Sequence, residues 1–150
     1  MICEKGSDWG KIKFKSVETG HDLNDLLENV KFSCLTWTHD NKGVFYNQYP
    51  KSTKSDGTAT EKNEFQQLFY HKIGTQQSDD ILVAKFEDAN WMGHAEISDC
   101  GNYLLVGISK SCDPVNMEWY VDLRIYNFEI NSNFEFVKLV NNFDAKYEVC

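Results

Sequence analysis

The chain has 150 residues, of which 41% are hydrophobic and 14% aromatic, and a formal net charge of −8. This composition is typical of a folded domain rather than a disordered chain. The acidic balance argues against a nucleic-acid partner, which would need clustered Lys and Arg, and no stretch approaches the roughly 20 apolar residues of a membrane helix.

The cysteines are odd in number and have neither the spacing of a disulfide framework nor that of a zinc site: Cys3, Cys34, Cys100, Cys112 and Cys150. The first residues contain no apolar signal-peptide core. The glycines are isolated, so there is no loop that would cradle a phosphate. We therefore expect reduced thiols, a cytoplasmic location and no cofactor or metal.

The first 30 residues contain one clear strand. Residues 11–17 alternate, which places the three lysines at 11, 13 and 15 on the face of a strand that contacts water. Residues 23–30 (LNDLLENV) fit either two helical turns with Asp22 as the N-cap or a short connection into the next strand.

A β-hairpin follows, with residues 31–37 and 44–49 as its strands and the Asp-, Asn- and Gly-containing residues 39–43 as its turn. The polar residues 50–63 are long for a connector and predict a functional or variable surface loop. A second hairpin is expected at residues 65–73 and 81–86.

The next stretch repeats this order. Strands are expected at residues 92–98, 102–109, 118–128 and 134–140, with an interruption at Pro114, which cannot donate to a ladder. Residues 145–150 would begin a third cycle. Thr38 and Ser98 occupy equivalent places before the two turns, 60 residues apart.

Consecutive four-stranded antiparallel units with a long repeat predict an all-β protein, a partial β-propeller. The expected units are residues 1–30 (the end of one blade), 31–89 (a second blade), 90–142 (a third blade) and 143–150 (the start of the next). A β-sandwich is the alternative, because a similar number of strands would build one. Since both ends fall inside a blade, we expect a fragment of a longer protein.

Nothing in the pattern alone singles out a catalytic site. The chain has no Gly-x-Ser-x-Gly segment, and its four histidines lie far apart in the sequence. Cys112 follows a strand and precedes Asp113-Pro114, so it falls at a strand end; the plain interpretation is a small buried hydrophobic residue. A non-catalytic propeller that serves as a binding scaffold is therefore an alternative to an enzyme.

Several motifs, in order, resemble the propeller domain of the prolyl oligopeptidase family. They are GSDWGKIKF, KFSCLTWTHDNKGVFYNQYP, GTQQSDDILVAKF, NWMGHAEISDCGNYLLVGIS and SCDPVNMEWYVDL, and the likeness runs from about Gly6 to Asp144. The resemblance implies a cytosolic serine endopeptidase that cleaves short peptides after proline. In that family a seven-bladed propeller covers an α/β-hydrolase domain that carries the catalytic triad, so this chain would hold about two and a half blades and be inactive alone.

The resemblance also implies three substrate-binding residues. Phe32 matches a pocket phenylalanine, Met92 a pocket methionine, and Cys112 a cysteine that faces the catalytic cavity. Together they would form an apolar subsite for the residue two before the proline. The family often has an arginine where Ser109 stands here, and strand alternation would point Lys110 the other way. The implied partners are short proline-containing peptides and the hydrolase domain of the same parent chain.

Overall fold

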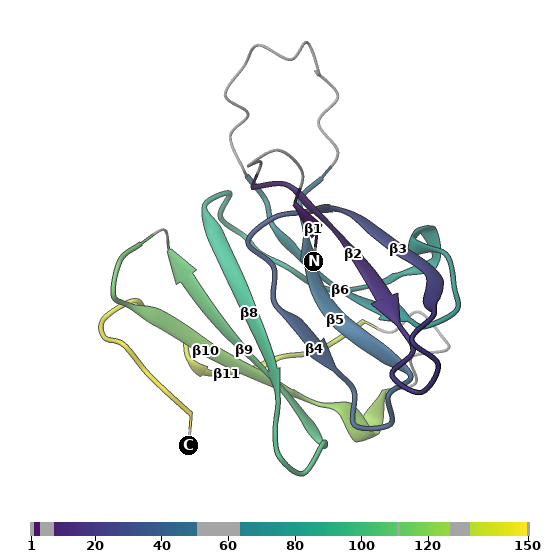
Figure 1. Ribbon diagram of the computed structural model, residues 1–150. Coiled ribbons are helices and arrows are strands. Elements are labelled where there is room, and N and C mark those ends of the chain that lie inside the picture. The colour runs from purple at the N-terminus through teal and green to yellow at the C-terminus, as the bar shows by residue number, and fades with distance from the viewer. Residues whose placement is uncertain (1, 4–7, 51–63, 111, 127–132, 150) are drawn as a thin grey trace, which may run out of the picture.

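The computed structural model describes residues 2–3, 8–50, 64–110, 112–126 and 133–149. Of the expected loop at residues 50–63, only Pro50 belongs to this described part. The described residues form three antiparallel sheets (Figure 1). All regular elements are β-strands except two short 3-10 helices, which confirms the all-β prediction.

The first sheet has three strands and the second has four. The first has the order β1-β2-β3, formed by β1 (Ile2–Cys3), β2 (Gly10–Lys15) and β3 (Asp22–Val30). The second has the order β4-β5-β6-β7, formed by β4 (Leu35–Trp37), β5 (Gly43–Gln48), β6 (Gln67–Lys72) and β7 (Ile81–Lys85). The 3-10 helix η1 (Gln77–Asp79) joins β6 to β7.

The third sheet has the order β11-β10-β9-β8. Its strands are β8 (Trp91–Ile97), β9 (Tyr103–Lys110), β10 (Asn116–Asp122) and β11 (Val137–Val140). The 3-10 helix η2 (Leu123–Ile125) follows β10. Successive four-stranded antiparallel sheets, each connected strand to neighbouring strand, are the arrangement of propeller blades.

The second sheet lies between the other two, and β5 serves both interfaces (Figure 1). Val44 and Tyr46 are fully buried in one core with the β3 residues Leu27 and Val30. Phe45, which points to the opposite face because side chains alternate along a strand, is fully buried in a larger core with side chains of the third sheet. β5 is therefore buried on both faces.

The two hairpin turns have matching hydrogen bonds, as the spacing of 60 residues predicted. Thr38 N donates to Gly43 O at 3.0 Å, and Ser98 N donates to Tyr103 O at 3.0 Å. In return, the Thr38 and Ser98 hydroxyls each accept from the amide of that same residue at 3.1 Å. Residue three of each turn, Asn41 or Gly101, has a positive φ of 57° or 74°. The repeat is thus present in backbone geometry.

Residues 22–30 form a strand, so the expectation of helical turns or a short connection is wrong. Apolar residues 23, 26, 27 and 30 have the helical spacing, but Leu23 and Leu26 are 37% and 38% exposed. Leu27 and Val30 are fully buried against the second sheet instead. Tertiary packing overrides the local periodicity here.

Other expected strands are shorter or absent, and β11, for example, begins at Val137 rather than at residue 134. Within the described part of residues 118–128, the chain leaves the ladder after Asp122, whose carboxylate accepts from Arg124 N at 3.0 Å and starts η2. Residues 145–149 form no strand within the described range. They are held on β10 by Asn116. Its backbone N donates to Ala145 O at 3.1 Å, and its side-chain Oδ1 accepts from Tyr147 N at 2.6 Å.

Candidate functional site

The three residues that the sequence singled out lie on one side of the second and third sheets, where strands begin or end, rather than along an outer strand. Because neighbouring strands are antiparallel, β5, β7 and β9 end at this edge, and β6 and β8 begin there (top of Figure 1). Phe32 precedes β4, Met92 is the second residue of β8, and Cys112 lies two residues beyond the end of β9. We call this the Phe32 edge.

Phe32 lies outside the sheet in a left-handed backbone conformation. Its φ is 48°, the residue is 56% exposed, and the Lys31 ammonium lies 5.0 Å from the ring centroid. A positive φ is uncommon for a bulky residue other than glycine. The expected strand over residues 31–37 therefore begins only at Leu35.

The reason is a set of side-chain hydrogen bonds that replaces the ladder. Cys34 N donates to the Asn47 side chain at 3.1 Å, and Asn47 N donates to the Ser33 hydroxyl at 2.7 Å. Such side-chain partners offer the backbone an alternative to strand pairing. They fix the chain between Phe32 and β4 in a path that turns Phe32 toward solvent.

Gln66 connects Phe32 to the third sheet, although no pattern in the sequence singles it out. The side chain is fully buried just before β6. Its Nε2 donates to Phe32 O at 3.1 Å, and its Oε1 accepts from Gly93 N at 2.8 Å. Gly93 directly follows Met92, so this one amide joins two of the three predicted residues. A glutamine near the start of an expected strand carries no local signal that would reveal this role.

Met92 lies at the start of β8 at the Phe32 edge, and Cys112 lies in the turn after the neighbouring strand β9. Met92 is half-buried and is paired in register with Ser109, whose hydroxyl donates to Met92 O at 3.5 Å. The Cys112 thiol is exposed, in the turn where Asp113 N donates to Lys110 O at 3.3 Å. The described contacts thus join Phe32 to Met92 through Gln66 and place Cys112 at the same edge.

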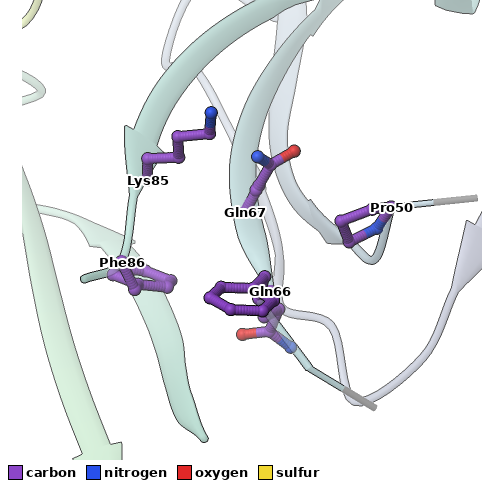
Figure 2. Close-up of a pocket in the computed structure, with 6 residues that line it drawn as sticks. Pro50, Gln66, Gln67, Lys85 and Phe86 are labelled. Atoms are coloured by element: carbon purple, nitrogen blue, oxygen red, sulfur yellow. The ribbon is translucent and has the colours of Figure 1, made fainter. Parts of the chain in front are cut away.

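A pocket of about 530 Å³ opens at the Phe32 edge, next to Gln66. Figure 2 shows Lys85, the last residue of β7, and Phe86, which follows it, facing Gln66 and Gln67, before and at the start of β6. Its lining residues are Pro50, Phe65, Gln66, Gln67, Lys85 and Phe86. Aromatic walls with a few polar groups are typical of ligand pockets. Gln66 therefore contributes to this pocket as well as to the link between Phe32 and Met92.

A buried histidine lies elsewhere, between the first and second sheets. His71 is fully buried; its Nδ1 lies 2.6 Å from Asp80 Oδ1 and its Nε2 lies 3.1 Å from Asp25 Oδ1. Burial lowers the pKa of His71, but hydrogen bonds and the charges of Asp80 and Asp25 outweigh it and raise the pKa overall. Since both ring nitrogens are occupied, His71 has none left to activate a serine.

Tyr46 extends this cluster. Its hydroxyl donates to Asp80 Oδ2 at 2.7 Å, and burial together with the Asp80 carboxylate raises the pKa of this hydroxyl. The Phe14 ring stacks on His71 with 5.9 Å between the ring centroids. The cluster is therefore a structural link between the first and second sheets.

Among the described residues, no group of three or more His, Cys, Asp and Glu side chains is arranged to hold a metal ion. In the same part of the chain, no helix has the length and apolar character needed to cross a membrane. The thiols of Cys34, Cys100 and Cys112 are free, the first buried and the other two exposed.

Comparison with known proteins decides the family. The family described as "Prolyl oligopeptidase, N-terminal beta-propeller domain" matches residues 2–150. The chain belongs to the prolyl oligopeptidase family. The resemblance seen in the motifs is thereby confirmed, and it applies to the propeller domain of that family.

Curated prolyl oligopeptidases match most of the chain. Prolyl oligopeptidase A of Amanita bisporigera is 36% identical over 85% of this chain and 17% of its own length. The dual function macrocyclase-peptidase POPB of Galerina marginata is 34% identical over 89% of this chain and 18% of its own. The prolyl endopeptidase of Elizabethkingia meningoseptica is 30% identical over 99% of this chain and 20% of its own. The chain thus spans about a fifth of these relatives.

Solved structures of the family share the fold. Prolyl oligopeptidase B from Galerina marginata, as the apo protein, superposes with a TM-score of 0.79 at 28% identity and covers 96% of this chain and 20% of its own. A mutant of that protein bound to a 25mer macrocyclization substrate gives a TM-score of 0.82 at 26% identity, over 95% and 21% of the two chains.

Proposed function

We propose that this chain is the propeller portion of a serine endopeptidase that cleaves short peptides after proline. The family match and the named relatives support a peptidase as the parent protein. Since the chain spans about a fifth of their length, the catalytic α/β-hydrolase domain would come from the rest of the same parent chain. The chain would contribute about two and a half of seven blades, divided at residues 30/31, 89/90 and 142/143.

Within that enzyme, Phe32, Met92 and Cys112 line an apolar subsite for the residue two before the proline. The observation that carries this assignment is the geometry of Phe32: the residue is 56% exposed at a positive φ, and Gln66 joins its carbonyl to the strand of Met92. An exposed aromatic ring on a costly, well-anchored backbone is suited to contact a ligand. Ser109 provides no cationic contact for extended substrates.

The propeller also gates access, admitting short proline-containing peptides to the covered catalytic site. Relatives from Galerina marginata have been solved with a 25mer and a 35mer substrate bound, which supports peptides as the partners. The exposed free thiols of Cys100 and Cys112 support a reducing compartment, and we place the enzyme in the cytoplasm.

The first test compares the 150-residue chain with the complete product of its gene. We expect the complete product to cleave a fluorogenic Gly-Pro peptide and a serine-directed inhibitor to block it, whereas the chain by itself shows no turnover. Inhibitor-sensitive cleavage by the chain alone would contradict the assignment of catalysis to another domain. An inactive complete product would favour a binding scaffold.

The second test uses the exposed thiol of Cys112 in the complete product. Alkylation with a bulky maleimide should raise KM several-fold for a peptide with an apolar residue two before the proline, because the adduct fills the subsite. Cys112→Ala protein should lose this sensitivity, whereas Cys100→Ala, which removes the other thiol found exposed among the described residues, should keep it. Equal sensitivity of the two variants would show that Cys112 does not lie at the subsite.

A further inference from the structure

Gln66 is a buried polar side chain with hydrogen bonds to the backbone of Phe32, which precedes β4, and of Gly93 in β8. The residue is 0% exposed and directly precedes β6. Strand pairing uses backbone groups, so it does not explain why a glutamine side chain is buried there. The amide donates to Phe32 O at 3.1 Å and accepts from Gly93 N at 2.8 Å. A buried amide satisfied at both ends has a single geometry, since any rotation would leave buried donors or acceptors without partners.

On the Phe32 side, the hydrogen bond holds a backbone that would otherwise relax. Phe32 has a φ of 48°, in the left-handed region that non-glycine residues avoid. Such a conformation persists only where the surroundings enforce it. Ser33 and Asn47 fix the chain that follows Phe32, and Gln66 fixes its carbonyl.

On the Met92 side, Gln66 holds the peptide bond that joins Met92 to Gly93. The N–H of this peptide donates to Gln66, and its carbonyl accepts from the Ser109 hydroxyl at 3.5 Å. Gly93 itself has no room for a side chain, because a Cβ there would lie 2.2 Å from the Phe86 ring. The backbone that carries Met92 is thus fixed from three sides.

We infer that Gln66 is a positioning residue that sets the spacing between Phe32 and Met92 and thereby the specificity of the apolar subsite. This inference rests on the proposed function, in which both side chains contact the residue two before the proline. Gln66 acts through the two backbones and need not touch the peptide. A displacement of either side chain by about 1 Å is enough to change turnover strongly.

The test compares two substrates in the complete product of the gene: acetyl-Phe-Gly-Pro-aminomethylcoumarin, which fills the subsite, and acetyl-Gly-Pro-aminomethylcoumarin, which does not. The measured quantity is the ratio of kcat/KM for the two, which is independent of the fraction of folded enzyme. Gln66→Met keeps the length of the side chain and removes both hydrogen bonds. It should lower the ratio about tenfold, mainly through KM for the longer substrate.

Gln76→Met is the control, an exposed glutamine that receives the same change and lies neither in the pocket nor in the contacts of Phe32 and Gly93; its ratio should equal that of the wild type. If Gln66→Met yields no folded protein, Gln66→Asn, which keeps the amide on a shorter arm, is measured in its place and should also lower the ratio. A wild-type ratio in the folded Gln66 variant would overturn the inference.

A double-mutant cycle with Phe32→Ala separates positioning from a general structural effect. If Gln66 acts in part through Phe32, Gln66→Met should change the ratio by clearly less than tenfold once Phe32 is alanine, and the remaining change would act through Met92. A full tenfold effect in that background would contradict positioning of Phe32. If the wild type itself shows no preference for the longer substrate, the proposed subsite is wrong and the inference fails with it. If the wild type shows the preference and Gln66→Met keeps it, only the inference about Gln66 is refuted.

Discussion

At the scale of single residues, the Asp25–His71–Asp80 cluster links the first sheet to the second. Asp25 belongs to β3 and His71 to β6, so the charged contact crosses the interface between two sheets. A buried charge is tolerated only when it is paired and hydrogen-bonded, and a protonated His71 between two carboxylates satisfies this condition. Its raised pKa makes the stability of this interface depend on pH.

We predict that stability decreases as the pH rises above about 6.5. Below the ordinary histidine pKa of 6.5, folded and unfolded chains both hold the proton and the stabilisation is complete. Above it the unfolded chain loses the proton first, and the stabilisation is lost progressively until pH passes the raised pKa of folded His71. The slope should be at most about 1.4 kcal/mol per pH unit.

Urea unfolding of the chain between pH 6 and pH 8 measures this slope. His71→Gln should lower the stability at pH 6 and flatten the decline, because it removes the proton that differs between the two states. His21→Gln, an exposed histidine, is the control and should keep the slope of the unchanged chain. A steep decline that persists in His71→Gln would assign the dependence to another group.

At the scale of elements, the short distance between β8 and the Phe86 ring limits which residue can occupy position 93, at the Phe32 edge. Gly93 faces the ring of Phe86, and a Cβ would lie 2.2 Å from Phe86 Cζ. Phe86 is only 4% exposed and belongs to the larger core, so it cannot move aside easily. Gly107, paired with His94 on the neighbouring strand, has more space: its Cβ would lie 3.1 Å from the flexible Glu118 carboxylate.

We therefore expect Gly93→Ala to cost about 1–3 kcal/mol of unfolding free energy, as overpacking of a core does. Gly107→Ala is the matched control in the same sheet, and we expect a change within about 0.5 kcal/mol, because the Glu118 side chain can rotate away. Chemical denaturation of the two variants checks this. Equal losses would mean that Phe86 yields as readily as Glu118.

At the scale of the whole molecule, three sheets are joined by apolar cores and by a few polar contacts that cross between them. Thr36 Oγ1 in β4 donates to Ala95 O in β8 at 2.7 Å, joining the second sheet to the third. Gln77 in η1 joins the second sheet to the first: its Oε1 accepts from Glu28 N and its Nε2 donates to Glu28 O, both at 3.0 Å. This side chain pairs with β3 as a short strand would.

Gln77→Leu should loosen the first sheet from the second. We expect a loss of about 1–3 kcal/mol in unfolding free energy, because the backbone groups of Glu28 lose these partners, and faster hydrogen exchange at the Glu28 amide. Gln76→Leu, the exposed neighbour, should leave both quantities near those of the unchanged chain. Unchanged exchange at Glu28 in Gln77→Leu would show that the cores alone hold the sheets together.

The local sequence determined the hairpins and the repeat. The turns after Thr38 and Ser98 form from hydrogen bonds within six residues, so residue types at fixed offsets were enough to predict them. Alternation likewise placed most strands, since side chains on successive residues point to opposite faces wherever the chain is extended. The likeness of the motifs to one family was sufficient for the family and its fold.

Only the tertiary structure decided the path of residues 22–34 and the role of Gln66. The apolar spacing in β3 fits a helix, but burying Leu27 and Val30 against the second sheet stabilises a strand. Phe32 leaves the sheet because Asn47, distant in sequence, supplies its neighbours with hydrogen bonds. Gln66 links the segment before β4 to the third sheet through partners 34 and 27 residues away. Contacts of such separation depend on how the sheets dock, which no local pattern encodes.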